Sequence, residues 1–217
     1  MNGSQLITMF NNLVEDSLDE TLAYQLLNNA KNKLESERPW EMLKKKDTSL
    51  TATAANTYTT EYSLPTDFYE MDSVFVDTTQ YASLNFEQQI DFKDTGNYYF
   101  IDHRTNKLHL CGTLGSSKSV YLFYLYATDD VKSDTSPIWP ARFHPLIAFE
   151  MAILFTEGID ADEASKIMSP GFLRAYADLK NQMIGWDARL KYTAMNGRTG
   201  ATSYLSNDPT IIHDPLL

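Results

Sequence analysis

A chain of 217 residues, 43% of them hydrophobic, can hold one large domain or a domain with an insert and is too apolar to be disordered. The formal net charge of −11 argues against nucleic-acid binding, because that affinity depends largely on Lys and Arg neutralising phosphates. The single cysteine excludes an intrachain disulfide and a cysteine-rich zinc site. No apolar run approaches the ~20 residues that cross a bilayer, and the N-terminus lacks the basic start of a secretory signal. We therefore expect folding in the cytoplasm.

Residues 1–46 are predicted to form the N-terminal helices of a bundle. Two successive segments have apolar residues at helical spacing; they are Leu6, Met9, Phe10, Leu13, Val14 and then Leu22, Leu26, Leu27, Ala30, Leu34. Pro39 has no N–H to donate, so we expect a break there. Trp40 is predicted to fill the core. The Lys44–Lys46 run is expected at a helix end, where cations complement the helix dipole.

Residues 47–130 are predicted to form an antiparallel β insert, because β-branched and aromatic residues replace the helical pattern. Met71, Val74 and Val76 indicate a strand packed mainly on one face. Residues 98–102 and 108–110 flank a turn and predict a hairpin. The run 120–126 is apolar on both faces, which favours a central strand covered on both sides.

Residues 131–195 return to helical spacing and are predicted to complete the bundle, with Pro170–Gly171 kinking or splitting the last helix. Two glycines, Gly197 and Gly200, then disfavour helix, so residues 196–217 are expected to form an extended C-terminal arm. The apolar side chains of this arm are the candidate partner-binding residues: Tyr204, Leu205, Ile211, Ile212, Leu216 and Leu217. The predicted fold class is therefore α+β, a helical bundle of about four helices with an antiparallel β insert and an extended C-terminal tail.

The sequence offers no catalytic constellation. His103 and His109 flank the predicted hairpin turn, and Cys111 follows on the same strand. A metal site needs three or four convergent ligands, and a nucleophilic cysteine needs a base in reach. We therefore predict no catalytic residue, no metal and no cofactor. We expect alanine at any of these three positions to leave assembly and infectivity near normal, apart from a packing loss at Cys111.

Five elements stand in an order and spacing found together in one group of viral proteins. They are the short helix at 39–43, the segment 62–68 that precedes a Val-rich strand, the hairpin strands 98–101 and 108–110, the strand 121–126, and the helix entry at 139–143. In this order the chain resembles the head–tail adaptor, or head-completion, proteins of tailed bacteriophages.

The resemblance implies a structural, non-enzymatic protein that forms a homo-oligomeric ring, commonly dodecameric, at the neck of the virion. It implies attachment beneath the portal protein through a C-terminal extension, a downstream tail or nozzle protein as second partner, and DNA passing through the channel without specific binding. Such a protein is made in the bacterial host cytoplasm and involves no membrane. Two alternatives stay open: another virion ring or tail-tube protein, and a small metal-dependent intracellular enzyme using His103 and His109.

Overall fold

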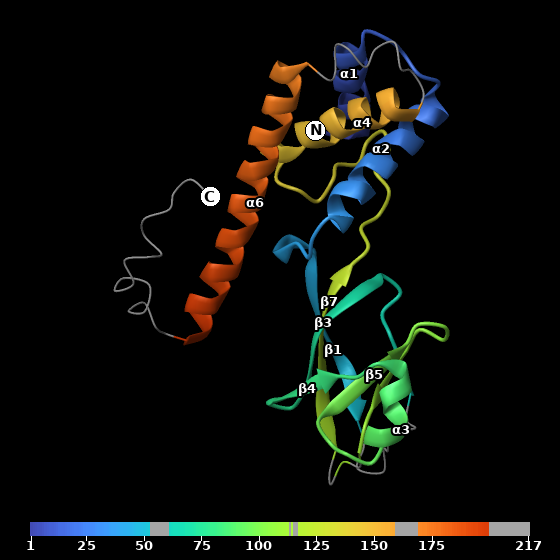
Figure 1. Ribbon diagram of the computed structural model, residues 1–217, viewed down its shortest axis with the longest axis vertical. Coiled ribbons are helices and arrows are strands. Elements are labelled where there is room, and N and C mark those ends of the chain that lie inside the picture. Colours follow the sequence, from blue (N-terminus) through green and yellow to red (C-terminus); the bar gives the residue numbers. More distant parts are fainter. Residues whose placement is uncertain (53–60, 113, 115–116, 159–168, 200–217) are drawn as a thin grey trace. The chain divides into compact units, whose positions relative to one another are not determined.

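The computed structural model describes residues 1–52, 61–112, 114, 117–158 and 169–199, and the side chains as far as residue 191 (Figure 1). The chain divides into two compact units. The helical unit combines Met1–Met42 with Asp130–Leu217, and the sheet unit is the continuous segment Leu43–Asp129. In the described residues, no helix combines the length and apolarity that a membrane span requires.

The helical unit is built from long helices, the first two of which begin at polar caps. Its elements are α1 (Gly3–Val14), α2 (Glu20–Ser36), the 3-10 turn η3 (Ala141–Phe143), α4 (Pro145–Gly158) and α6 (Pro170–Thr199). The Asn2 side chain accepts a hydrogen bond from the backbone N–H of Gln5, whose side chain in turn accepts from Asn2 N–H. Asp19 accepts from Thr21 and Leu22 at the start of α2. These caps explain why both helices begin where they do.

The core of the helical unit forms where α1 and α2 pack against α4. Leu6, Leu27 and Ile147 are fully buried there, and the Phe10 and Phe155 rings meet edge to face with centroids 5.6 Å apart. Helical spacing in the sequence identified the α1 and α2 residues of this core. Helix α4 is apolar around most of its circumference, so its spacing identified Ile147 but did not single out Phe155.

The break at Pro39 and the burial of Trp40 are confirmed. Helix α2 ends at Ser36, and Trp40 keeps only 1% of its surface exposed. Its indole Nε1 donates a 2.9 Å hydrogen bond to the carbonyl of Leu34, and the Arg38 guanidinium lies 5.0 Å from the ring centroid. Trp40 therefore closes the C-terminal end of α2 with both its ring and its N–H.

Helix α6 begins at Pro170, which agrees with the split, rather than the kink, among the two outcomes predicted for Pro170–Gly171. Proline suits this place because it lacks only an N–H that the first helical position cannot use. The hydroxyl and carbonyl of Ser169 accept from the N–H groups of Phe172 and Leu173. At the other end α6 runs to Thr199, so the first residues of the predicted 196–217 arm are helical.

The sheet unit is one seven-stranded sheet with the order β1-β7-β3-β4-β5-β6-β2. Its strands are β1 (Lys44–Ala52), β2 (Glu61–Ser63), β3 (Phe68–Val76), β4 (Thr79–Ser83), β5 (Tyr98–Asp102), β6 (Lys107–Leu110) and β7 (Lys118–Tyr126). Two 3-10 turns, η1 (Glu41–Leu43) and η2 (Phe86–Gln88), and the helix α3 (Gln89–Phe92) flank them. All seven strands contribute side chains to one buried cluster, so the sheet curves around a common core; examples are Ala52, Tyr62, Val74, Tyr81, Tyr99, Leu108 and Leu122.

The predicted strands at 71–76, 98–102 and 108–110 lie within β3, β5 and β6. Strand β7 is an interior strand as expected, with β1 on one side and β3 on the other. Only one of its faces is fully buried, however. Val120, Leu122 and Tyr124 enter the core, whereas Tyr121 and Phe123 point the other way and stay half-buried.

The predicted fold class is wrong in two respects. The described residues form five helices and a seven-stranded mixed sheet, rather than a bundle of about four helices with an antiparallel insert. Strands β4 and β5 are parallel, with Ala82 opposite Tyr98. A parallel pair needs a long crossover, and η2 and α3 supply it between the two strands. The alternation that marks a strand does not encode its direction, so the sequence could not reveal this pairing.

The Lys44–Lys46 run does not end a helix but begins β1. Lys45 lies 3.8 Å from the centroid of the Tyr126 ring, and Lys46 lies 4.7 Å from that of Tyr121. Lys44 and Lys45 also form ion pairs with Asp72 and Asp67, at 2.8 and 2.6 Å. Aromatic rings of β7 and the carboxylates of Asp72 in β3 and of Asp67 just before it replace the helix dipole as the partners of these cations.

Candidate functional site

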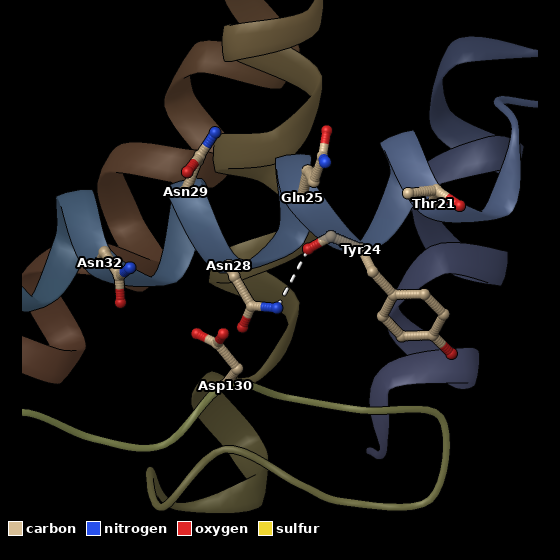
Figure 2. A pocket seen from close by; sticks show the side chains of 7 residues that line it. All are labelled: Thr21, Tyr24, Gln25, Asn28, Asn29, Asn32 and Asp130. Atoms are coloured by element: carbon tan, nitrogen blue, oxygen red, sulfur yellow. Dashed lines mark hydrogen bonds between the residues drawn. The ribbon is translucent and has the colours of Figure 1, made fainter.

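A polar groove of about 570 Å³ lies along α2 in the helical unit (Figure 2). Its lining residues are Thr21, Tyr24, Gln25, Asn28, Asn29, Asn32 and Asp130. Turn spacing brings these side chains to one face of α2, and the segment carrying Asp130 passes beside them (Figure 2). Amide side chains both donate and accept hydrogen bonds, so the groove suits a polar partner better than an apolar one.

The Asn28 side chain both donates and accepts hydrogen bonds to the backbone beside the groove. Its Oδ1 accepts from Val131 N–H at 2.8 Å, while its Nδ2 donates to Val131 O at 3.2 Å and to Tyr24 O at 3.1 Å. One side chain thus satisfies both backbone groups of Val131. The groove contains one carboxylate and no histidine or cysteine, so its lining offers no nucleophile paired with a base.

A buried carboxylate joins three helices of the same unit. Glu150 of α4 has its side chain 2% exposed and receives the Lys33 ammonium of α2 at 2.7 Å. The Tyr176 hydroxyl of α6 donates to Glu150 Oε2 at 2.5 Å. Lys180 donates to Tyr176 Oη at 3.2 Å and to Glu37 at 2.7 Å. Burial and the hydrogen bond to Glu150 raise the pKa of the Tyr176 hydroxyl, so it stays protonated and able to donate.

We expect Tyr176→Phe to lower the free energy of unfolding by about 1–3 kcal/mol, because a buried carboxylate loses a donor. Urea unfolding followed by circular dichroism measures the change. Tyr24→Phe is the matched control, since the Tyr24 hydroxyl lies 3.3 Å from Ser4 Oγ at an exposed position; it should change stability by less than about 0.5 kcal/mol. Equal effects of the two variants would contradict a structural role for the Glu150 contact.

Asp187 of α6 is the second buried carboxylate that ties elements together. It is 1% exposed, and its two oxygens accept from the backbone N–H groups of Glu41 and Met42, each at 3.2 Å. A carboxylate at these N–H groups satisfies donors that the short turn η1 leaves without partners. Asp187 therefore holds in place the last residues of the helical unit before the sheet unit begins.

The structure separates the residues considered for catalysis. His103 is exposed on the turn between β5 and β6. His109 is buried on β6 and stacks on Phe100 with ring centroids 4.3 Å apart and an interplanar angle of 6°. Cys111 is buried beside the same ring in a small cluster with Leu84, and burial raises the pKa of its thiol. In the part of the chain that the structure describes, no group of three or more His, Cys, Asp or Glu could hold a metal ion.

The six candidate partner-binding residues, Tyr204, Leu205, Ile211, Ile212, Leu216 and Leu217, lie outside the described residues. Their role stays a prediction.

Sequence reasoning missed an aromatic face on the outside of the sheet unit. Phe75 of β3 and Tyr121 and Phe123 of β7 point away from the core and are half-buried, with Lys46 of β1 beside them. The Phe75 and Phe123 centroids are 5.7 Å apart, edge to face. We call these four residues the aromatic face. The apolar pattern on both sides of 120–126 is the sequence signal of this face, but such a pattern also predicts a strand that is buried on both sides.

The model of one protein family, the SU10 adaptor protein, matches residues 1–200. No curated protein matches the chain. The family match spans both structural units and covers most of the sequence, and it confirms the resemblance to phage head–tail adaptors. The chain therefore belongs to the SU10 adaptor protein family, a family of structural adaptor proteins of bacteriophages.

Proposed function

We propose that this phage adaptor protein forms a homo-oligomeric ring at the neck of the virion, joins the portal protein to the downstream tail or nozzle protein, and leaves a channel for DNA. The observation that carries the proposal is the family match over residues 1–200. Two surfaces described above are suited to binding other proteins: the polar groove along α2 and the aromatic face on the sheet unit. Such surfaces suit an assembly component, whose work is to bind other proteins.

The experiment is electron microscopy of the purified protein, alone and mixed with the portal protein of the same phage. We expect rings attached to one end of the portal in the mixture. The downstream tail protein is then added to the portal–adaptor complex and should bind only when the adaptor is present. Portal particles that stay bare, or a tail protein that binds equally well without the adaptor, would contradict the proposal.

The predicted C-terminal arm is the proposed docking element toward the portal. Six apolar side chains, Tyr204, Leu205, Ile211, Ile212, Leu216 and Leu217, fall within a short segment punctuated by Pro209 and Pro215. Prolines disfavour helix, and an extended segment can lay its apolar side chains along a neighbouring surface. Because a ring presents many copies, weak docking of each arm would add up to firm attachment.

A channel that DNA passes through requires a surface that does not grip phosphates. The chain carries a net charge of −11, and in the sheet unit Lys44 and Lys45 are already paired with Asp72 and Asp67. We expect no binding of duplex DNA at physiological salt, because the net negative charge of the protein repels phosphates. Fluorescence anisotropy with a labelled duplex tests this. A micromolar affinity that falls steeply with added salt would show that the protein binds the DNA rather than letting it pass.

A further inference from the structure

The first observation concerns the aromatic face on the outside of β1, β7 and β3. Its three rings are half-buried although they point away from the core of the unit. The Lys46 ammonium lies 4.7 Å from the Tyr121 centroid and 5.7 Å from that of Phe123. The neighbouring Lys44 is paired with Asp72, whereas Lys46 contacts aromatic rings. The face thus combines partly exposed aromatic rings with a positive charge held over two of them, Tyr121 and Phe123.

The second observation concerns the segment Phe86–Asp91, which forms η2 and most of α3. We call it the acidic ridge. Ile90 is 73% exposed and Phe86 is 45% exposed, the two being one helical turn apart. Glu87 and Asp91 lie next to them in sequence and are exposed as well. The ridge therefore presents apolar and acidic side chains together, the complement of the aromatic face with its lysine.

The acidic ridge is anchored to the outside of β5. The Phe86 ring packs edge to face on Phe100 with centroids 6.1 Å apart, and Phe92 packs on Tyr98 at 5.1 Å. Arg104 also lies over Phe86, at 4.9 Å, and its charge is balanced by Asp102 at 3.4 Å. Ile90 is not part of this packing cluster and remains free for contact.

The two surfaces lie on different outer sides of the same unit. Tyr99 and Leu108 of β5 and β6 share one core with Val74 and Leu122 of β3 and β7. Phe100, next to Tyr99, points out of that core toward the ridge, and Phe123, next to Leu122, points out of it toward the aromatic face. Because a copy cannot bring its own ridge to its own face, complementary surfaces placed in this way can pair only between separate copies, head to tail.

We propose that the sheet units of neighbouring copies associate through these surfaces, the acidic ridge of one copy seating Phe86 and Ile90 on the aromatic face of the next. Glu87 and Asp91 then approach Lys46. The occupant is a second copy of this chain because both complementary surfaces are present on every copy. Such a contact is heterologous and repeats from copy to copy, which closes a ring when the rotation allows. The inference rests on the proposed ring and names the surface that builds it.

The test uses two charge-reversal variants. Each should weaken self-association when it is alone, and mixing the two should restore it. Lys46→Glu places a negative charge against the acidic ridge, and Glu87→Lys with Asp91→Lys places positive charges against Lys46. Each variant alone should self-associate at least about tenfold more weakly than the parent, equal to about 1.4 kcal/mol. Mixed in equal amounts, the two variants should regain association, since each face now meets an opposite charge on the other copy. Sedimentation velocity of the full-length chains over a range of concentrations measures this.

A cysteine pair provides the second measurement and does not depend on strong association. Lys46→Cys and Ile90→Cys are made in separate chains and mixed under mild oxidation, and we expect a disulfide-linked heterodimer. Tyr69→Cys replaces Ile90→Cys in the control, since Tyr69 is also exposed, at 57%, but lies outside both surfaces. Circular dichroism confirms that each variant is folded.

Unchanged association of the charge variants, no recovery on mixing, or equal cross-linking by Ile90→Cys and Tyr69→Cys would overturn the inference. Rings that still form on the portal in any of these cases would leave the proposed function standing and show that other surfaces build the ring. Absence of rings on the portal, by contrast, is the failure of the proposed function itself.

Discussion

Deleting Ser203–Leu217 should leave a folded protein that no longer joins the portal. Burying the six apolar side chains of the proposed arm is worth a gross ~9–18 kcal/mol at ~1.5–3 kcal/mol each. The entropy of ordering the arm offsets much of this, so we expect a single arm to bind weakly and a ring of arms to bind firmly. The deletion lies outside both cores described above, which is why we expect the remaining chain to fold.

Binding of the truncated chain to immobilised portal, measured by interferometry, checks this expectation. A full-length control with serine at all six positions, Tyr204, Leu205, Ile211, Ile212, Leu216 and Leu217, separates the loss of apolar contacts from the loss of chain length. We expect both variants to lose binding and to keep the circular dichroism spectrum of the parent. Unchanged affinity would mean that the arm is not the docking element, and so would a truncated chain that fails to fold.

Trp40→Ala should lower the free energy of unfolding of the helical unit by about 3–5 kcal/mol, the usual effect of emptying a large aromatic site in a core. Trp40 keeps 1% of its surface exposed, and its N–H satisfies the Leu34 carbonyl at the end of α2. The substitution therefore opens a cavity and leaves a buried carbonyl without its donor.

Urea unfolding, followed by far-ultraviolet circular dichroism, gives the comparison with the parent. Trp40→Phe is the graded control: it keeps most of the ring volume and loses the hydrogen bond, so its effect should be clearly smaller than that of alanine. Helix α6 offers a further comparison, because Leu173→Ala removes a side chain that is 38% exposed and should change stability by less than about 1 kcal/mol. If Trp40→Ala and Leu173→Ala have similar effects, Trp40 does not close the core as described.

Local patterns predicted the elements of this fold better than their arrangement. Helical spacing located α1, α2 and α4, and proline chemistry located the end of α2, because both depend on residues close in sequence. The parallel pairing of β4 with β5 and the use of the Lys44–Lys46 run in a strand depend on partners far along the chain. Alternation alone carries no information on such partners.

The same limit applies to the candidate sites. Glu150 is a lone carboxylate in the apolar stretch 145–155, and that isolation signals a buried acid that needs a partner. Its partner Tyr176 lies 26 residues away on another helix, so the sequence could not identify it. The sequence likewise did not identify Ile90 and Phe86 as exposed residues, since a short amphipathic turn has the same pattern whether it is covered or exposed.

The division of the chain has a consequence for the order in which its parts are made. The sheet unit is one uninterrupted segment, Leu43–Asp129, whereas the helical unit is assembled from residues on both sides of it. During synthesis from the N-terminus, every residue of the sheet unit has therefore emerged before α4 exists. The apolar stripes of α1 and α2 are covered only after α4 has been made. The backbone N–H groups of Glu41 and Met42 gain their acceptor, Asp187, later still. The sheet unit is thus synthesised completely before the helical unit, although α1 and α2 are made first and complete their packing only after the later helices have been made.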